Sequence, residues 1–262
     1  MDNPITIKIL GSGTSTGVPV VGCSCAVCCS HDPRNQRSRS SALLSWDGYQ
    51  VLIDSSPDLR QQCLAHGVTR VDAVLYTHNH ADHVHGIDDL RVLNGHPDQP
   101  LPIYGDQRLV DHLKLHFRYA FEPQSKISYR PRLKGTVLKE AVTLFGRTIQ
   151  PIRLDHGDEA ILGYRVGDMA YLTDCSGIPD GSRTLLQGLK LLVIDGLRFR
   201  DHPTHFTVTQ AIDVAQQLQA KRIILTHLSH DVDYGAHQHH LPECVEYAYD
   251  GLTVLLNDGN KV

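Results

Sequence analysis

The sequence lacks any long apolar run. No stretch approaches the roughly 20 apolar residues that a transmembrane helix needs, and residues 1–4 (MDNP) have neither the basic nor the apolar region of a signal peptide. We therefore expect no membrane association and a cytoplasmic location. A large excess of charge is also missing, since the formal net charge is -4 over 262 residues. This balance predicts no bulk attraction to nucleic acid or to an anionic membrane.

The cysteines do not form a pattern typical of disulfides. Seven cysteines is an odd number, and four of them crowd between residues 23 and 29. In a reducing compartment such crowding favours a metal site over a set of disulfides. Histidine, in contrast, is abundant, with 17 in the chain, and several of them stand in short clusters beside aspartate. The composition therefore directs attention to metal binding.

The spacing of apolar residues predicts an α/β fold. It predicts a strand over 5–10 and a hairpin of strands over 41–44 and 49–53 that turns at Asp47-Gly48. The predicted helices cover 58–66, 87–93, 107–119 and 207–219, the last behind a capping box. The remaining predicted strands cover 71–77, 102–104, 142–144, 148–154, 161–166, 169–173, 191–194 and 222–226. No linker divides the chain, so we predict a single four-layer domain over residues 1–262.

The densest cluster of possible metal ligands is in residues 77–83 (THNHADH), directly after a predicted buried strand. Alternate residues of an extended chain point the same way, so His78 and His80 can face one ion. If the chain then turns into a helix, Asp82 and His83 can serve a second ion. Imidazole and carboxylate suit zinc, manganese or iron. Four donors within six positions favour a metal site over a His-rich surface loop.

This segment resembles the signature of the metallo-β-lactamase superfamily. Three further motifs follow in the order of that family, each at a predicted strand end: His156 in LDHG, Asp174 in YLTD and His227 in ILTH. The resemblance implies an αββα sandwich with two adjacent metal ions. It implies one ion held by His78, His80, His156 and Asp174, and another held by Asp82, His83, Asp174 and His227.

A loop at about residues 17–40 contains Cys23, Cys25 and Cys28. Three thiolates and one imidazole would complete a tetrahedral structural zinc site, with Cys29 as a competing ligand and free thiols as the alternative. The segments GVP and GCSCAVC of this loop resemble the PhnP-type branch of the superfamily, whose phosphodiesterase opens a ribose 1,2-cyclic phosphate. The resemblance implies His230 as the fourth zinc ligand and a homodimeric assembly.

Hydrolysis of a phosphodiester expels an alkoxide, so a proton donor accelerates it. The resemblance implies that His205 is this donor, and His202 is the alternative. It also implies attack by a metal-bridging hydroxide, with Asp82 among the catalytic residues. We expect Asp54 either to orient a metal-bound histidine or simply to end a strand.

We therefore predict a dinuclear-metal phosphodiesterase that opens cyclic or small phosphodiesters. Three alternatives remain open: an endonuclease resembling those that trim tRNA 3′ ends, a thioester or lactam hydrolase of the same fold, and a metal- or nucleotide-binding protein without activity. The chain has no Gly/Pro-rich basic arm, which argues against a nucleic-acid substrate. The cysteine loop favours the phosphodiesterase.

Overall fold

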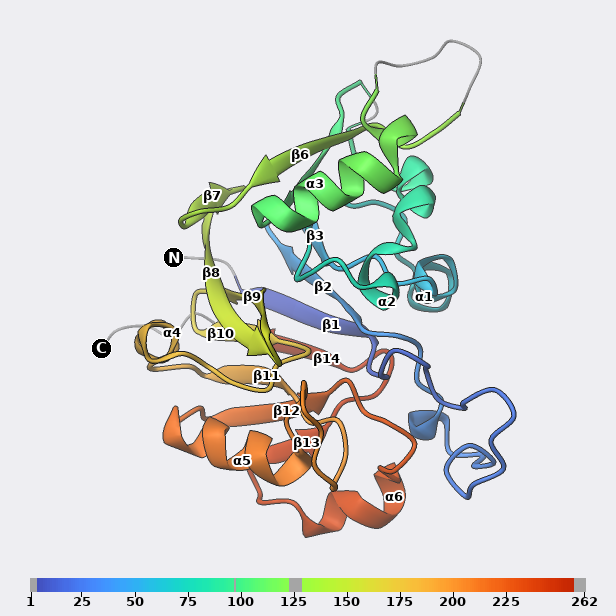
Figure 1. Cartoon of the computed structure of the whole chain (residues 1–262), viewed down its shortest axis with the longest axis vertical. Helices are drawn as coiled ribbons and strands as arrows, with labels where there is room; N and C mark the ends of the chain where they lie inside the picture. The colour runs from blue at the N-terminus through green and yellow to red at the C-terminus, as the bar shows by residue number, and fades with distance from the viewer. Residues whose placement is uncertain (1–3, 97, 123–128, 257–262) are drawn as a thin grey trace.

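The computed structural model describes residues 4–96, 98–122 and 129–256, and it places them in two seven-stranded sheets (Figure 1). The first sheet has the order β14-β1-β2-β3-β4-β5-β6. Its strands are β1 (Ile5–Gly11), β2 (Ser41–Trp46), β3 (Tyr49–Ile53), β4 (Ala73–Leu75), β5 (Leu101–Gly105), β6 (Leu133–Val137) and β14 (Thr253–Leu256). The second sheet has the order β13-β12-β11-β10-β9-β8-β7. Its strands are β7 (Val142–Leu144), β8 (Arg147–His156), β9 (Glu159–Val166), β10 (Met169–Leu172), β11 (Leu191–Asp195), β12 (Arg222–Thr226) and β13 (Val245–Tyr247).

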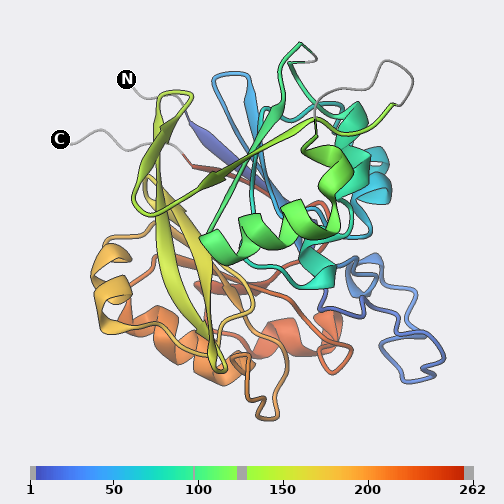
Figure 2. The ribbon, with the colours of Figure 1, turned by 45° about the horizontal axis from the view of Figure 1, so that its top comes forward.

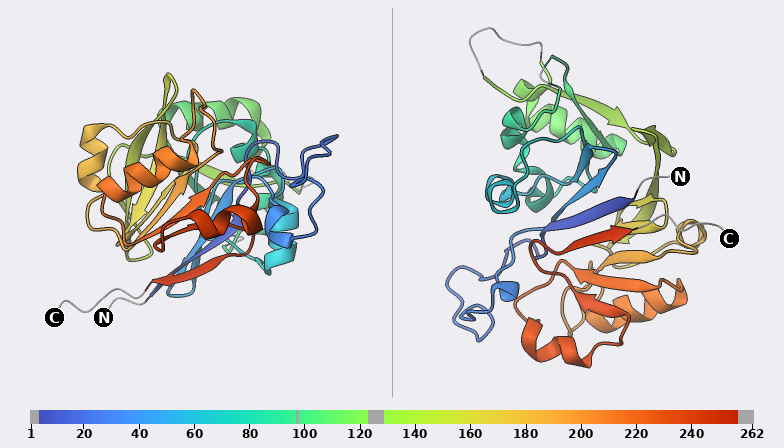
Figure 3. Two further views of the ribbon diagram at one scale, coloured as in Figure 1. Left: turned by 90° about the horizontal axis from the view of Figure 1, so that it is seen from below. Right: turned by 180° about the vertical axis from the view of Figure 1, so that it is seen from behind.

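Helices cover the outer face of each sheet (Figures 2 and 3). The first sheet packs against α1 (Leu59–His66), α2 (Ala81–Val84) and α3 (Gln107–His116), and the second against α4 (Asp180–Leu185), α5 (Val208–Gln217) and α6 (Tyr234–His237). The expected αββα sandwich is confirmed. In the described part of the chain, no helix combines the length and the apolar character that crossing a bilayer requires.

Local sequence signals account for the main turns and helix ends. The β2–β3 hairpin turns at Asp47 and Gly48, whose φ angles are 50° and 80°, as the favoured two-residue turn requires. Helix α1 ends at Gly67, which has a φ of 66°. Helix α5 begins with the expected capping box between Thr207 and Gln210. Residues that adopt a left-handed conformation at low cost therefore mark the chain reversals.

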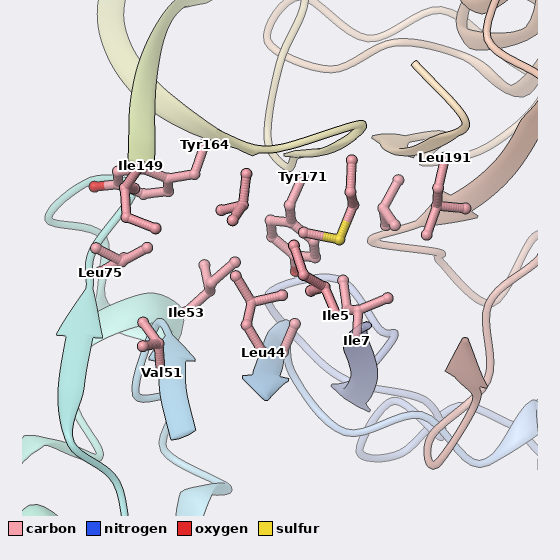
Figure 4. Packing of buried hydrophobic residues seen from close by; sticks show 14 of the residues in the cluster. Ile5, Ile7, Leu44, Val51, Ile53, Leu75, Ile149, Tyr164, Tyr171 and Leu191 are labelled. Atoms are coloured by element: carbon pink, nitrogen blue, oxygen red, sulfur yellow. The ribbon is translucent and has the colours of Figure 1, made fainter. Parts of the chain in front are cut away.

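The inner faces of the two sheets form a common core (Figure 4). Ile7 and Leu44 from the first sheet lie with Tyr164 and Tyr171 from the second, and all four are fully buried. Alternation explains this arrangement, because every second residue of β1 points inward. The core holds the two sheets in a fixed relation, and with them the ends of their strands.

The structure differs from the sequence-based prediction mainly at the edges of the sheets. Strands β6, β13 and β14 were not predicted, and each is the terminal strand of its sheet. These strands are only three to five residues long, so they contain too little alternation to indicate a strand. Residues 87–93 were predicted as a helix, and Ile87–Val92 forms a 3-10 helix.

The common core generates a stability prediction. Ile7→Ala should lower the free energy of unfolding by about 3 kcal/mol, because it leaves a cavity between the sheets. Leu255→Ala is the matched control, since Leu255 is 59% exposed, and it should cost less than about 0.5 kcal/mol. Urea unfolding followed by circular dichroism measures both. Equal losses in the two variants would contradict the assignment of the core.

Candidate metal centre

Polar residues stand at the carboxyl ends of strands from both sheets, and the sandwich brings these ends together. The first sheet contributes Asp54 after β3 and residues 77–83 after β4. The second sheet contributes His156 at the end of β8, Asp174 after β10, Asp195 at the end of β11 and His227 after β12. We call His78, His80, Asp82, His83, His156, Asp174 and His227 the histidine–aspartate cluster.

One side of this cluster consists of His78, His80 and His156. One nitrogen from each lies within 4.8 Å of the others. The Nδ1 of His156 donates to the carbonyl oxygen of Thr204 at 2.9 Å. Because a carbonyl can only accept, this bond fixes the tautomer and leaves the Nε2 lone pair of His156 free to bind a cation.

The other side of the cluster is built around Asp174. Ligand atoms of Asp82, Asp174 and His227 lie within 4.8 Å of one another, as do those of His78, His83 and Asp174. The Oδ1 of Asp174 is 2.9 Å from Nδ1 of His227 and 3.2 Å from Nε2 of His83, and its Oδ2 is 3.9 Å from Nε2 of His78. Asp174 therefore faces ligand atoms on both sides of the cluster.

Unpartnered atoms test whether metal ions fit the cluster. Nε2 of His78, Oδ2 of Asp82, Nε2 of His83 and Nδ1 of His227 are buried, and none makes a hydrogen bond of acceptable geometry within the described residues, although Nδ1 of His227 and Nε2 of His83 lie 2.9 and 3.2 Å from Oδ1 of Asp174. Buried polar atoms are rarely left without partners, because losing water costs free energy that nothing recovers. Divalent cations between these atoms would satisfy all of them. The residues therefore fit a metal centre.

Burial and neighbouring charges together set the protonation states of the ligands, and a metal ion requires neutral imidazole and ionised carboxylate. Burial lowers the pKa of His78 well below its ordinary value, so the imidazole is neutral. Burial alone would raise the pKa of Asp174. His227 and His83 outweigh that effect, and the pKa lies well below its ordinary value.

His83 differs from His78: burial alone would lower its pKa, but Asp174, Asp82 and Asp54 outweigh burial and hold the pKa well above its ordinary value. A cation bound at His83 would therefore displace a proton, and the donor set would then be neutral imidazole beside ionised carboxylate.

Asp54 holds the first part of the cluster in place. It is fully buried and accepts hydrogen bonds from the backbone nitrogen and the hydroxyl of Thr77, both at 2.8 Å. Its Oδ2 also lies 2.7 Å from Nδ1 of His83. The carboxylate thereby orients the His83 ring so that Nε2 points to Asp82 and Asp174.

A His–Asp pair that was not predicted lies beside the cluster. Nδ1 of His205 is 2.6 Å from Oδ2 of Asp195, and burial raises the pKa of Asp195 well above its ordinary value. The His205 ring lies 5.0 Å from that of His156 and 5.0 Å from that of His202. Sequence reasoning missed Asp195, although it ends an apolar strand as Asp174 does.

The cysteine loop forms a second group, which we call the cysteine cluster: Cys23, Cys25, Cys28 and His230. Nδ1 of His230 lies 3.3, 3.7 and 3.5 Å from the sulfurs of Cys23, Cys25 and Cys28. Cys29 is exposed and lies outside this group. His227 and His230 belong to one short segment, so this segment contributes to both clusters.

Comparison with known proteins identifies the family. Residues 49–228 match the family model described as the beta-lactamase superfamily domain. The chain belongs to the beta-lactamase superfamily. The matched residues include the whole histidine–aspartate cluster, and the expectation of a metal-dependent hydrolase of this superfamily is confirmed at this level.

Individual relatives of this superfamily member differ in their described activities. A solved structure described as a new diphosphatase from the PhnP family is 41% identical, covers 98% of each chain and has a TM-score of 0.91. The octanoyltransferase of Porphyromonas gingivalis is 42% identical over 257 residues. That match covers 95% of this chain and 51% of the relative, so the chain spans about half of that protein's length. The short form of human tRNase Z is 21% identical, with a TM-score of 0.69, and the match covers 96% of this chain and 99% of the other. At this identity, the similarity shows only that the two chains share a fold.

Asp54 generates a prediction about metal affinity. Asp54→Asn should weaken binding of the ion nearest His83 by about 10- to 100-fold, because the ring loses its fixed orientation. Titration against a chromophoric chelator measures the affinity. Asp213→Asn is the control, since Asp213 is exposed on α5. An unchanged affinity in Asp54→Asn would show that the carboxylate does not orient the ligand.

Proposed function

We propose that the chain is a dinuclear-metal hydrolase that cleaves a small phosphoric diester or diphosphate. The observation that carries the proposal is Asp174, whose two carboxylate oxygens face two groups of imidazole and carboxylate ligands. The 41% identity to a PhnP-family diphosphatase supports phosphorus as the atom attacked. Zinc, manganese and iron all suit these donors.

In this proposal, His78, His80, His156 and Asp174 hold one ion, and Asp82, His83, Asp174 and His227 hold the other. Bound ions would supply an activated water and neutralise charge on the phosphoryl oxygens. The chain itself holds the ligands rigid, because Asp54 orients His83 and the Thr204 carbonyl orients His156.

His205 supplies the proton for the departing oxygen. Its Nδ1 is fixed against Asp195, which leaves Nε2 as the atom that can carry a proton to the substrate. Ligand atoms of His156, Asp174 and His205 also lie within 4.8 Å of one another. His205 could therefore bind a metal instead, and the experiment on His205 below distinguishes the two roles. His202 is the alternative donor.

The proposal also covers the cysteine cluster, the assembly and the location. Three sulfurs and one imidazole nitrogen at these distances match the ligand set of a structural zinc site. The proposed assembly is a homodimer, which sedimentation equilibrium tests. The proposed location is the cytoplasm, and the proposed substrate is a small molecule rather than a nucleic acid.

A second candidate is an acyl-thioester hydrolase. The octanoyltransferase relative favours it, because octanoyl is an acyl group and a thioester is one chemical form in which an acyl group can be presented to a hydrolase. The unmatched half of that relative weakens this argument, because the transferase activity can belong to that half. The phosphorus-directed proposal comes from a relative that this chain covers almost completely.

Asp174→Ala provides the main test of the proposed function. It should abolish binding of both ions and reduce turnover to background, because each ion loses its shared ligand. Metal analysis gives the ion content. Turnover is measured on a ribose cyclic phosphate, a 2′,3′-cyclic nucleotide, a nucleoside diphosphate, bis(p-nitrophenyl) phosphate, an octanoyl thioester and a precursor tRNA. Full activity with two ions bound in Asp174→Ala would refute the metal assignment, and turnover of the thioester alone would establish the second candidate.

His205→Ala tests the proton donor. Turnover of an alkyl diester should fall by about 10²- to 10⁴-fold, whereas turnover of bis(p-nitrophenyl) phosphate should fall by less than about 10-fold, since p-nitrophenolate needs no proton. His202→Ala tests the alternative donor: it should change neither rate, and a selective loss on the alkyl diester in His202→Ala but not in His205→Ala would make His202 the donor. A loss of bound metal in His205→Ala would instead make His205 a ligand.

A further inference from the structure

A buried arginine contacts the segment that links the histidine–aspartate cluster to the cysteine cluster. Arg37 is 2% exposed. Its guanidinium donates to the carbonyl oxygens of Ser229 at 3.1 Å and Val232 at 2.9 Å. It also donates to the side-chain oxygen of Asn35 at 2.9 Å and to the carbonyl of Arg34 at 3.2 Å. One side chain therefore joins the cysteine loop to that segment.

The position of Arg37 places it between the two clusters. Its backbone pairs with Val18, with nitrogen-to-oxygen distances of 2.7 and 2.8 Å, and this pairing closes the cysteine loop. The two carbonyls that it contacts lie on either side of His230, and Ser229 lies two residues after His227. The guanidinium therefore contacts the chain on both sides of His230 and close to His227.

The segment has little freedom to move one histidine without the other. The nitrogen of Leu228 donates to the carbonyl of Ser12 at 2.8 Å, and the Leu228 carbonyl accepts from the nitrogen of Thr14 at 3.2 Å. His227 has a φ of 59°, a conformation that a non-glycine residue keeps only where its surroundings enforce it. The contacts around the segment thus supply the force that holds His227 in place.

The chemistry of Arg37 indicates that this position requires an arginine. Its described partners are all carbonyl or amide oxygens, and burial lowers its pKa to about 10. A buried cation is costly unless several acceptors compensate it. The planar fork of a guanidinium can serve separate carbonyls at once, which a lysine ammonium on a flexible stem cannot do with the same geometry.

We propose that Arg37 is a positioning residue that couples the two metal sites, so that metal in the cysteine cluster raises the metal affinity of the histidine–aspartate cluster. The inference rests on the proposed function, since it requires ions at both clusters. Metal in the cysteine cluster fixes the position of His230. Arg37 connects the cysteine loop to Ser229 and Val232, so the segment that contains His227 becomes fixed as well. His227 then binds an ion beside Asp174 with a smaller loss of conformational entropy. Such coupling is reciprocal and should be about tenfold.

The first experiment uses the unaltered protein. Mn²⁺ binds oxygen and nitrogen ligands in preference to thiolates, so it fills the histidine–aspartate cluster. Co²⁺ bound to the cysteine cluster gives a thiolate-to-metal charge-transfer absorption. One equivalent of Co²⁺, whose charge-transfer absorption shows that it is bound at the thiolates, should tighten Mn²⁺ binding to the histidine–aspartate cluster by about tenfold relative to protein without Co²⁺. An unchanged Mn²⁺ affinity would overturn the coupling, whereas protein that binds no Mn²⁺ would overturn the proposed function instead.

The second experiment assigns the coupling to Arg37. The Mn²⁺ affinity, measured by electron paramagnetic resonance with Co²⁺ in the cysteine cluster, should fall about tenfold in Arg37→Lys. Cys25→Ser should produce a similar fall, and the exposed Cys29 provides the matched control Cys29→Ser, which should produce none.

The double variant Arg37→Lys/Cys25→Ser completes a cycle and should lose no more affinity than Cys25→Ser alone, because both changes break the same link. Additive losses, or wild-type affinity in Arg37→Lys, would refute the role of Arg37. The experiment on the unaltered protein needs no substitution, so it decides the coupling even where a variant fails to fold.

Discussion

Buried ligand atoms of the histidine–aspartate cluster converge on Asp174, and the positions of the surrounding strands and loops can be understood from the need to keep these atoms together. Several of these atoms have no hydrogen-bond partner among the described residues, so without cations the cluster is a costly arrangement of desolvated polar groups. The common core of the two sheets keeps it together, because it fixes the strand ends from which the ligands project. The free energy that stabilises the sandwich thus also holds these ligand atoms close together, against the cost of their desolvation.

Several ligands are held by residues that are not themselves ligands. Asp54 orients His83, the Thr204 carbonyl orients His156, and Arg37 contacts the segment of His227. These contacts come from a strand end, a loop and the base of the cysteine loop. A metal site with fixed ligands loses little entropy when ions bind, which favours tight binding. Segments distant in the sequence therefore contribute to one property, the rigidity of the ligand set.

The predictable parts of the molecule were those with a local cause. The β2–β3 hairpin follows from Asp47-Gly48, the start of α5 from its capping box, and β1 from simple alternation. The αββα sandwich came from the resemblance of residues 77–83 and the later motifs. Strands β6, β13 and β14 were missed, because a short edge strand is stabilised by pairing with a neighbouring strand, and the local sequence does not indicate which strand that is. Asp195 was missed because the residues next to it in the sequence include no other possible ligand that would separate it from an ordinary aspartate at the end of a strand.

The sequence by itself determined the donors: which imidazoles, carboxylates and thiolates exist, and that most of them follow apolar strands. Only the tertiary structure decided which of them meet. Asp174 faces ligands on both sides, His205 pairs with Asp195, and Arg37 contacts carbonyls almost 200 residues away. The physical reason is that side-chain type and strand periodicity are local properties. The distance between two ligand atoms depends instead on how two sheets pack, and no short segment contains that information.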